Sequence, residues 1–131
     1  MKKQFLAACV LLAGMVAASS ASAQSTFPYS CSNIGFAYSG NYPTLQAVCL
    51  QANGAPHATS LTLQGISNQN GQLTQGSGGS TFQQSCGSIM IVNNGPIVIL
   101  SAYCRTSSGS STATSLSLNN IGNNNGNLVQ Q

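Results

Sequence analysis

The chain has 131 residues, of which three are Lys or Arg, one is His and none is Asp or Glu. Without carboxylates it lacks the acid pair of most glycoside hydrolases, the acid of a serine triad and the oxygen ligands that Ca²⁺ prefers. So few basic residues cannot form the clusters that bind nucleic acid or anionic membranes, and we expect no enzyme, metal, cofactor or nucleic-acid partner.

Residues 1–23 have the pattern of a secretory signal peptide. Two lysines open the segment, an uncharged apolar run covers residues 5–18, and a triplet of small residues follows at 21–23. Cleavage is expected before Gln24. The apolar run is shorter than the roughly 20 residues that a helix needs to cross a bilayer. We therefore expect a soluble protein without membrane insertion, secreted or periplasmic.

A second interpretation of this segment depends on Cys9. Residues 6–9 resemble the sequence box that directs lipid attachment to a bacterial cysteine. Almost no apolar run precedes this box, and a signal of that type needs one. Cleavage before Gln24 is therefore the preferred interpretation.

The following segment predicts short strands separated by turns. Apolar residues alternate with period two, which is typical of strands with one buried face. The alternating runs cover residues 34–38, 45–49 and 61–63. Turn-forming residues lie at 41–43, 53–54 and 70–71. The Asn70-Gly71 pair is a strong hairpin signal, because both residues tolerate positive φ.

The same pattern returns 55 residues later. Residues 27–76 align with residues 82–131 without a gap, and 20 of the 50 positions are identical. Both cysteines and the apolar ladder stay in step, so we infer a duplicated supersecondary unit. We expect one domain over 24–131, with repeat one at 27–76 and repeat two at 82–131. The Gly- and Ser-rich segment Gln75–Ser80 is expected to be a flexible connector.

The four cysteines after the signal segment suggest two disulfide bridges. Cys31 and Cys49 are 18 positions apart, and Cys86 and Cys104 repeat this separation. One bridge within each repeat is predicted, out of three possible connectivities. Each bridge should stabilise the fold by about 3 kcal/mol in the loop-entropy model. Zinc binding is the competing interpretation, but there is no close Cys-x2-Cys pair and export leads to an oxidising compartment.

These motifs together resemble the cyanovirin-N homology family of sugar-binding proteins. The resemblance covers the chain after the signal segment. It rests on Phe27-x3-Cys31, Cys49 followed by Asn53-Gly54, Ser60-Leu61-x-Leu63 and Asn70-Gly71-x-Leu73, in a pattern that recurs 55 residues later. It implies an all-β fold of two tandem repeats related by a pseudo-twofold axis. Each half would consist of a three-stranded sheet plus a β-hairpin, with strands exchanged between the repeats.

The resemblance also implies a lectin with two shallow, metal-independent sites for mannose-type oligosaccharides or glycoproteins. Carried over by alignment, the second-repeat site falls on Ser67, Asn70, Ser80, Thr81, Gln84, Ser85, Arg105, Thr106 and Ser107. The first-repeat site falls on Thr26, Tyr29, Ser30, Leu50, Ala52, Asn123 and Asn125. The second-repeat site is expected to be stronger, because Arg105 offers a charged donor whereas Leu50 and Ala52 are apolar.

A secreted structural or adhesive β-protein without sugar binding is the alternative function. Strands rich in Asn and Gln with almost no charge are prone to pair through their edges. Fibre repeats of that kind are shorter and carry no cysteine pairs, which favours the lectin.

His57 has no acid to orient it and is expected to be a solvated loop residue. The long connector favours a monomer over a dimer that exchanges halves.

Overall fold

The computed structural model describes residues 23–131. The predicted signal peptide, except for Ala23, and the alternative lipid site at Cys9 lie outside the described residues. None of the described helices is long and apolar enough to span a membrane. The elements in chain order are η2 Phe27–Tyr29, β1 Cys31–Ser39, β2 Tyr42–Leu50, β3 Pro56–Thr62, β4 Gln64–Gln69, β5 Gln72–Gly79, η3 Phe82–Gln84, β6 Cys86–Asn94, β7 Ile97–Arg105, β8 Ser111–Ser117, β9 Ile121–Asn124 and β10 Asn127–Gln130.

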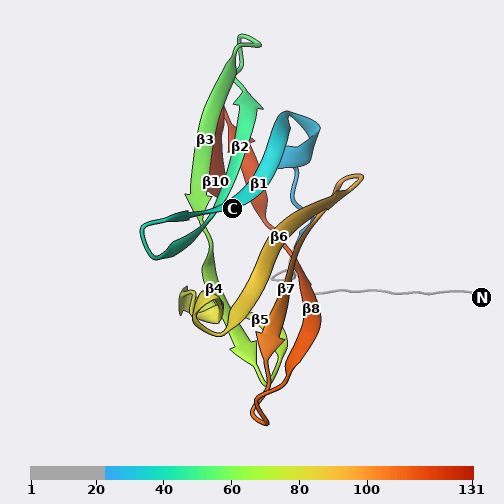
Figure 1. Cartoon of the computed structure of the whole chain (residues 1–131). Coiled ribbons are helices and arrows are strands. Elements are labelled where there is room, and N and C mark those ends of the chain that lie inside the picture. Colours follow the sequence, from blue (N-terminus) through green and yellow to red (C-terminus); the bar gives the residue numbers. More distant parts are fainter. Residues whose placement is uncertain (1–22) are drawn as a thin grey trace, which may run out of the picture.

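The strands form two antiparallel three-stranded sheets and two hairpins. One sheet has the order β1-β2-β3 and the other β6-β7-β8, while β4 pairs with β5 and β9 with β10. Figure 1 shows the two sheets toward opposite ends of the molecule, with β1 and β6 approaching each other at its middle. The predicted all-β fold, with a sheet plus a hairpin in each half, is confirmed.

Each hairpin packs against the sheet of the other repeat. Hairpin β4–β5 lies against β8, where the Leu73 amide donates to Thr114 Oγ1 at 3.1 Å. Hairpin β9–β10 lies against β3, where the Leu128 amide donates to Thr59 Oγ1 at 3.1 Å. The two bonds are equivalent under the 55-residue shift. Each half of the fold therefore combines residues of both repeats.

The Asn-Gly pairs form the hairpin turns that the sequence predicts. Asn70 and Gly71 have φ values of 51° and 90°, and Asn125 and Gly126 have the same values. Two consecutive positive φ angles give the turn whose twist matches that of paired strands. A Cβ atom on Gly71 would also lie only 2.8 Å from Thr106 Cγ2. Glycine is thus required both for the turn and for contact with the neighbouring loop.

Both predicted disulfides are present. Cys31–Cys49 joins directly paired residues of β1 and β2, and Cys86–Cys104 joins the corresponding residues of β6 and β7. Because all four cysteines of the described chain are in bridges, none is left as a thiolate for zinc. The bridges fix the strand ends from which the candidate sites are built.

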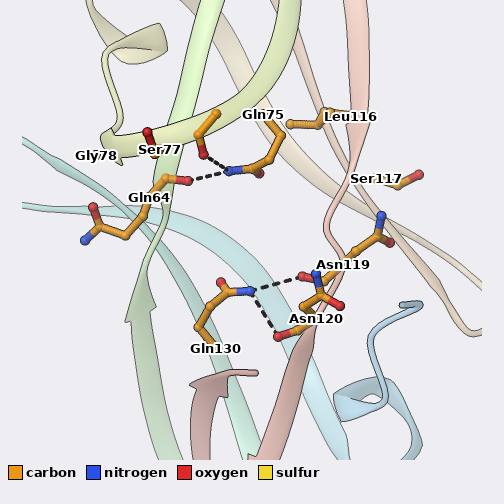
Figure 2. Close-up of a pocket in the computed structure, with 10 residues that line it drawn as sticks. Gln64, Gln75, Ser77, Gly78, Leu116, Ser117, Asn119, Asn120 and Gln130 are labelled. Carbon is orange, nitrogen blue, oxygen red and sulfur yellow. Dashed lines mark hydrogen bonds between the residues drawn. The ribbon is translucent and has the colours of Figure 1, made fainter. Parts of the chain in front are cut away.

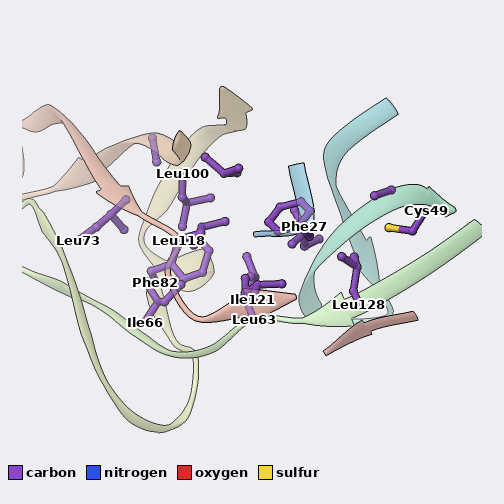
Figure 3. Close-up of a cluster of buried hydrophobic side chains, with 14 of the residues drawn as sticks. Phe27, Cys49, Leu63, Ile66, Leu73, Phe82, Leu100, Leu118, Ile121 and Leu128 are labelled. Atoms are coloured by element: carbon purple, nitrogen blue, oxygen red, sulfur yellow. The ribbon is translucent and has the colours of Figure 1, made fainter. Parts of the chain in front are cut away.

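The core follows the period-two alternation. On β7, Val98, Leu100, Ala102 and Cys104 are buried at every second position. They belong to a cluster that takes in side chains of both repeats. Figure 3 shows Phe27 and Phe82 in this cluster, one from each short helix.

The expectation that Gln75–Ser80 forms a flexible connector is wrong. Residues as far as Gly79 belong to β5, where Gly79 pairs with Gln64. A Cβ atom on Gly65 would overlap the Gly76 carbonyl, so these glycines allow two backbones to pack closely. The composition indicated flexibility, but the small residues instead serve strand pairing.

Candidate functional site

An asparagine that the sequence reasoning missed organises the second-repeat site. Asn68 on β4 donates from Nδ2 to Ser85 Oγ and to the Arg105 carbonyl, both at 2.9 Å. Its Oδ1 accepts from the Gly71 amide at 2.7 Å. One side chain thus joins the hairpin turn, the end of η3 and the end of β7. The available signal was that the same residue type recurs at position 123.

Asn70 ties the tip of the hairpin to the loop after β7. Its Oδ1 accepts from the Ser107 amide at 2.8 Å and from Ser107 Oγ at 2.9 Å. No described hydrogen bond uses the Asn70 Nδ2 group, which is therefore free to donate to a ligand. Next to this loop, Arg105 is exposed and has no Asp or Glu side chain anywhere in the chain to pair with.

Most of the other predicted residues of this site lie at the surface, and Ser80 is the exception. Thr81 and Gln84 are exposed around η3, and Thr106 lies in a hydroxyl network with Ser108 and Ser110 at 2.9 and 3.0 Å. Ser67 accepts from Gln69 Nε2 at 3.0 Å.

Ser80 has a different environment. Its hydroxyl accepts from the Ile66 amide at 3.0 Å and donates to the Leu63 carbonyl at 2.7 Å. Ser80 thus bonds to the backbone on both sides of the start of β4. Because its hydroxyl proton is already used in the bond to Leu63, Ser80 has no donor left for a ligand.

The first-repeat site has the same frame. Asn123 donates to Ser30 Oγ at 2.8 Å and to the Leu50 carbonyl at 2.9 Å, and it accepts from the Gly126 amide at 2.7 Å. Asn125 Oδ1 accepts from the Ala52 amide at 2.8 Å. Ala52 has no hydroxyl, so the second bond that Ser107 makes in the other half has no counterpart here.

Much of the surface beside this frame is apolar. Thr26 is exposed just before η2, and its carbonyl accepts from the Tyr29 amide at 3.1 Å. Tyr29, Leu50 and Pro56 line a hollow of about 250 Å³ beside Ser30. The sequence reasoning counted Leu50 as a lost polar contact, whereas the structure makes it part of this hollow.

Solved structures with this architecture establish the family. The cyanovirin-N homolog of T. borchii is 31% identical, with a TM-score of 0.65 over 81% of this chain and 99% of its own chain. The chain belongs to the cyanovirin-N homolog (CVNH) family. A designed CVNH lectin is 29% identical, with a TM-score of 0.64 over 81% of this chain and 99% of its own. Microvirin, solved in complex with mannobiose, is 29% identical, with a TM-score of 0.63 over 81% and 98%. No protein-family model and no curated protein matches the chain.

A second hollow, of about 420 Å³, lies between the two halves of this CVNH fold (Figure 2). Gln75 Nε2 donates to the Gln64 carbonyl at 2.9 Å, and Gln130 Nε2 donates to the Asn119 carbonyl at 3.3 Å. Gln75 and Gln130 occupy the same position in the two repeats. Gln64 and Gln75 belong to the same hairpin, and Asn119 lies just before β9, so each glutamine braces the base of its own hairpin beside this hollow.

His57 is not in the loop where it was expected. It lies on β3, exposed and opposite Cys49 in the strand register. Pro56 occupies the first position of this edge strand, where proline is tolerated.

The neutral amides, hydroxyls and single guanidinium around the two asparagine frames are suited to hydrogen bonding. The designed CVNH protein is named as a lectin, which fits the expectation that this chain is not an enzyme.

Proposed function

We propose that this CVNH chain is a secreted lectin that binds neutral, mannose-type oligosaccharides without a metal. The observation that carries the proposal is the frame of Asn68 and Asn70. It holds backbone and hydroxyl groups in fixed positions and leaves the Asn70 Nδ2 group and the Arg105 guanidinium free. A site that is ordered before the ligand arrives loses less entropy on binding.

The chemistry of this frame suits a neutral sugar. Sugar hydroxyls both donate and accept, and the site offers amide and guanidinium donors together with hydroxyl oxygens. A hydrogen bond to a charged group contributes about 1.5–3 kcal/mol, against about 1 kcal/mol for a neutral one. The second-repeat site should therefore bind mannose-type sugars more tightly than the first. Microvirin, a similar structure with bound mannobiose, supports the sugar class.

A glycan array tests this function. The oxidised protein comprising residues 24–131 is applied in EDTA to an array of mannose-terminated, galactose-terminated and sialylated glycans. Signal on the mannose-terminated glycans, unchanged by the chelator, is the expected result. Absence of binding to every glycan would contradict the proposal and favour the structural or adhesive alternative.

A further inference from the structure

The two asparagine frames have the same geometry but different surroundings. Tyr29, Leu50 and Pro56 surround the first frame. The residues at the same positions of the second repeat are Gln84, Arg105 and Ser111. One aromatic and two apolar side chains in one half thus correspond to three polar or charged ones in the other. Comparing the two sites therefore shows how a change of surrounding side chains changes the ligand that each frame can bind.

The apolar side chains form one continuous surface. Leu50 and Pro56 are directly opposite each other at the ends of β2 and β3. Leu50 is 48% exposed and Tyr29 is 73% exposed. Val48 adds to the same hollow; its counterpart in the second repeat is Tyr103. A hydroxyl group placed against Val48, Leu50 and Pro56 would lose water without gaining a partner, whereas a methyl group would be favoured there.

Three hydroxyl groups line the hollow, those of Tyr29, Ser30 and Ser32, and only the Ser30 hydroxyl takes part in a described side-chain hydrogen bond. The Ser30 Oγ accepts from Asn123 Nδ2 at 2.8 Å. No described hydrogen bond uses the Ser30 hydroxyl as a donor. This hydroxyl is therefore oriented by Asn123 and can still donate to a carbonyl oxygen. A donor beside an apolar surface matches a group that has a carbonyl next to a methyl.

We propose that the first-repeat site selects a neutral sugar bearing a 2-acetamido group. The acetamido methyl packs against Tyr29, Leu50 and Pro56, and its carbonyl accepts from Ser30. The inference rests on the proposed lectin function and divides it between the halves, leaving mannose-type sugars to the second-repeat site. A 6-deoxy sugar also carries a methyl group, but it has no carbonyl for Ser30.

Three sugar probes distinguish these possibilities by NMR titration of ¹⁵N-labelled, oxidised protein. The probes are the N-acetylglucosamine disaccharide, mannobiose and methyl α-L-fucoside. We expect the N-acetylglucosamine disaccharide to shift the amide signals of Tyr29, Ser30 and Leu50. We expect mannobiose to shift those of Asn70 and Arg105.

Tyr29→Ala should weaken binding of the N-acetylglucosamine disaccharide about tenfold, the lower end of what a filled apolar pocket contributes. The control is Tyr42→Ala, which removes a tyrosine that is 65% exposed at the opposite end of β2. It should leave this affinity unchanged. Ser30→Ala should weaken the N-acetylglucosamine disaccharide but not the fucoside. Well-dispersed amide spectra of each variant establish that it is folded.

The outcomes separate this inference from the proposed function. Binding of mannobiose without binding of the N-acetylglucosamine disaccharide would overturn the inference and leave the lectin intact. Fucoside binding of equal strength at Tyr29 would also overturn it, because the methyl group alone would then be recognised. Binding of none of the three sugars would contradict the lectin function itself.

Discussion

Replacing Asn68 by alanine tests the asparagine frame. Asn68 makes three hydrogen bonds of 2.7–2.9 Å, to Gly71, Ser85 and Arg105. The bonds to Ser85 and Arg105 connect the hairpin of repeat one to repeat two, and the bond from Gly71 closes the hairpin turn. The substitution removes all three bonds while leaving the buried core untouched.

The expected loss of stability follows from this geometry. A hydrogen bond contributes a net 0.5–1.5 kcal/mol, so three bonds would give about 3 kcal/mol. Asn68 is only partly buried, so water can restore some of what its partners lose. We therefore expect Asn68→Ala to lower the free energy of unfolding by about 2 kcal/mol. Asn123→Ala should cost a similar amount, because Asn123 makes the equivalent three bonds.

Guanidinium unfolding of the oxidised protein, followed by circular dichroism, measures this loss. The control is Asn124→Ala. Asn124 follows Asn123 in the chain, is exposed, and its side chain makes no described hydrogen bond. A surface change of that kind usually stays within about 0.5 kcal/mol. If Asn68→Ala lost no more stability than Asn124→Ala, the reasoning about the frame would be refuted.

Further predictions concern the binding residues, the bracing of each hairpin and the state of the protein. Arg105→Ala should weaken mannobiose binding about tenfold by calorimetry, as expected from the loss of one charged hydrogen bond. Ser80→Ala should leave that affinity unchanged but lower the unfolding midpoint; the opposite pattern would show that Ser80 contacts sugar. Gln75→Ala and Gln130→Ala should each cost about 1 kcal/mol in chemical unfolding, and no loss in either would contradict the bracing role. Light scattering should show a monomer and intact mass should show a mature start at Gln24, whereas a micromolar dimer or a lipid on Cys9 would contradict them.

Local features of the fold could be predicted from the sequence. The two Asn-Gly turns depend on the φ preferences of their own residues, and Asn70 and Gly71 adopt the expected angles. The disulfides follow from the repeated 18-residue spacing, because cysteines in step in both copies indicate one bridge per copy. Period-two alternation also correctly marked the buried face of β7.

Features that depend on distant neighbours could not be predicted in the same way. Glycine is suited both to a flexible linker and to close strand packing, and only the contact of Gly65 with Gly76 shows that packing applies. Asn68 is one of many asparagines in the chain, and its role depends on partners up to 37 positions away. The role of Leu50 in an apolar hollow depends on Tyr29 and Pro56, which lie beside it only in the folded chain. The frames and the apolar hollow are therefore products of the tertiary structure.

Calorimetric titration of the oxidised protein with mannobiose in EDTA tests the central claim most directly. The account predicts saturable binding heat that the chelator does not change, weakened by Arg105→Ala and preserved in Asn124→Ala. No saturable heat with the native protein, while its disulfides are intact and its spectrum is that of a folded β-protein, would contradict the assignment of this chain as a mannose-type lectin.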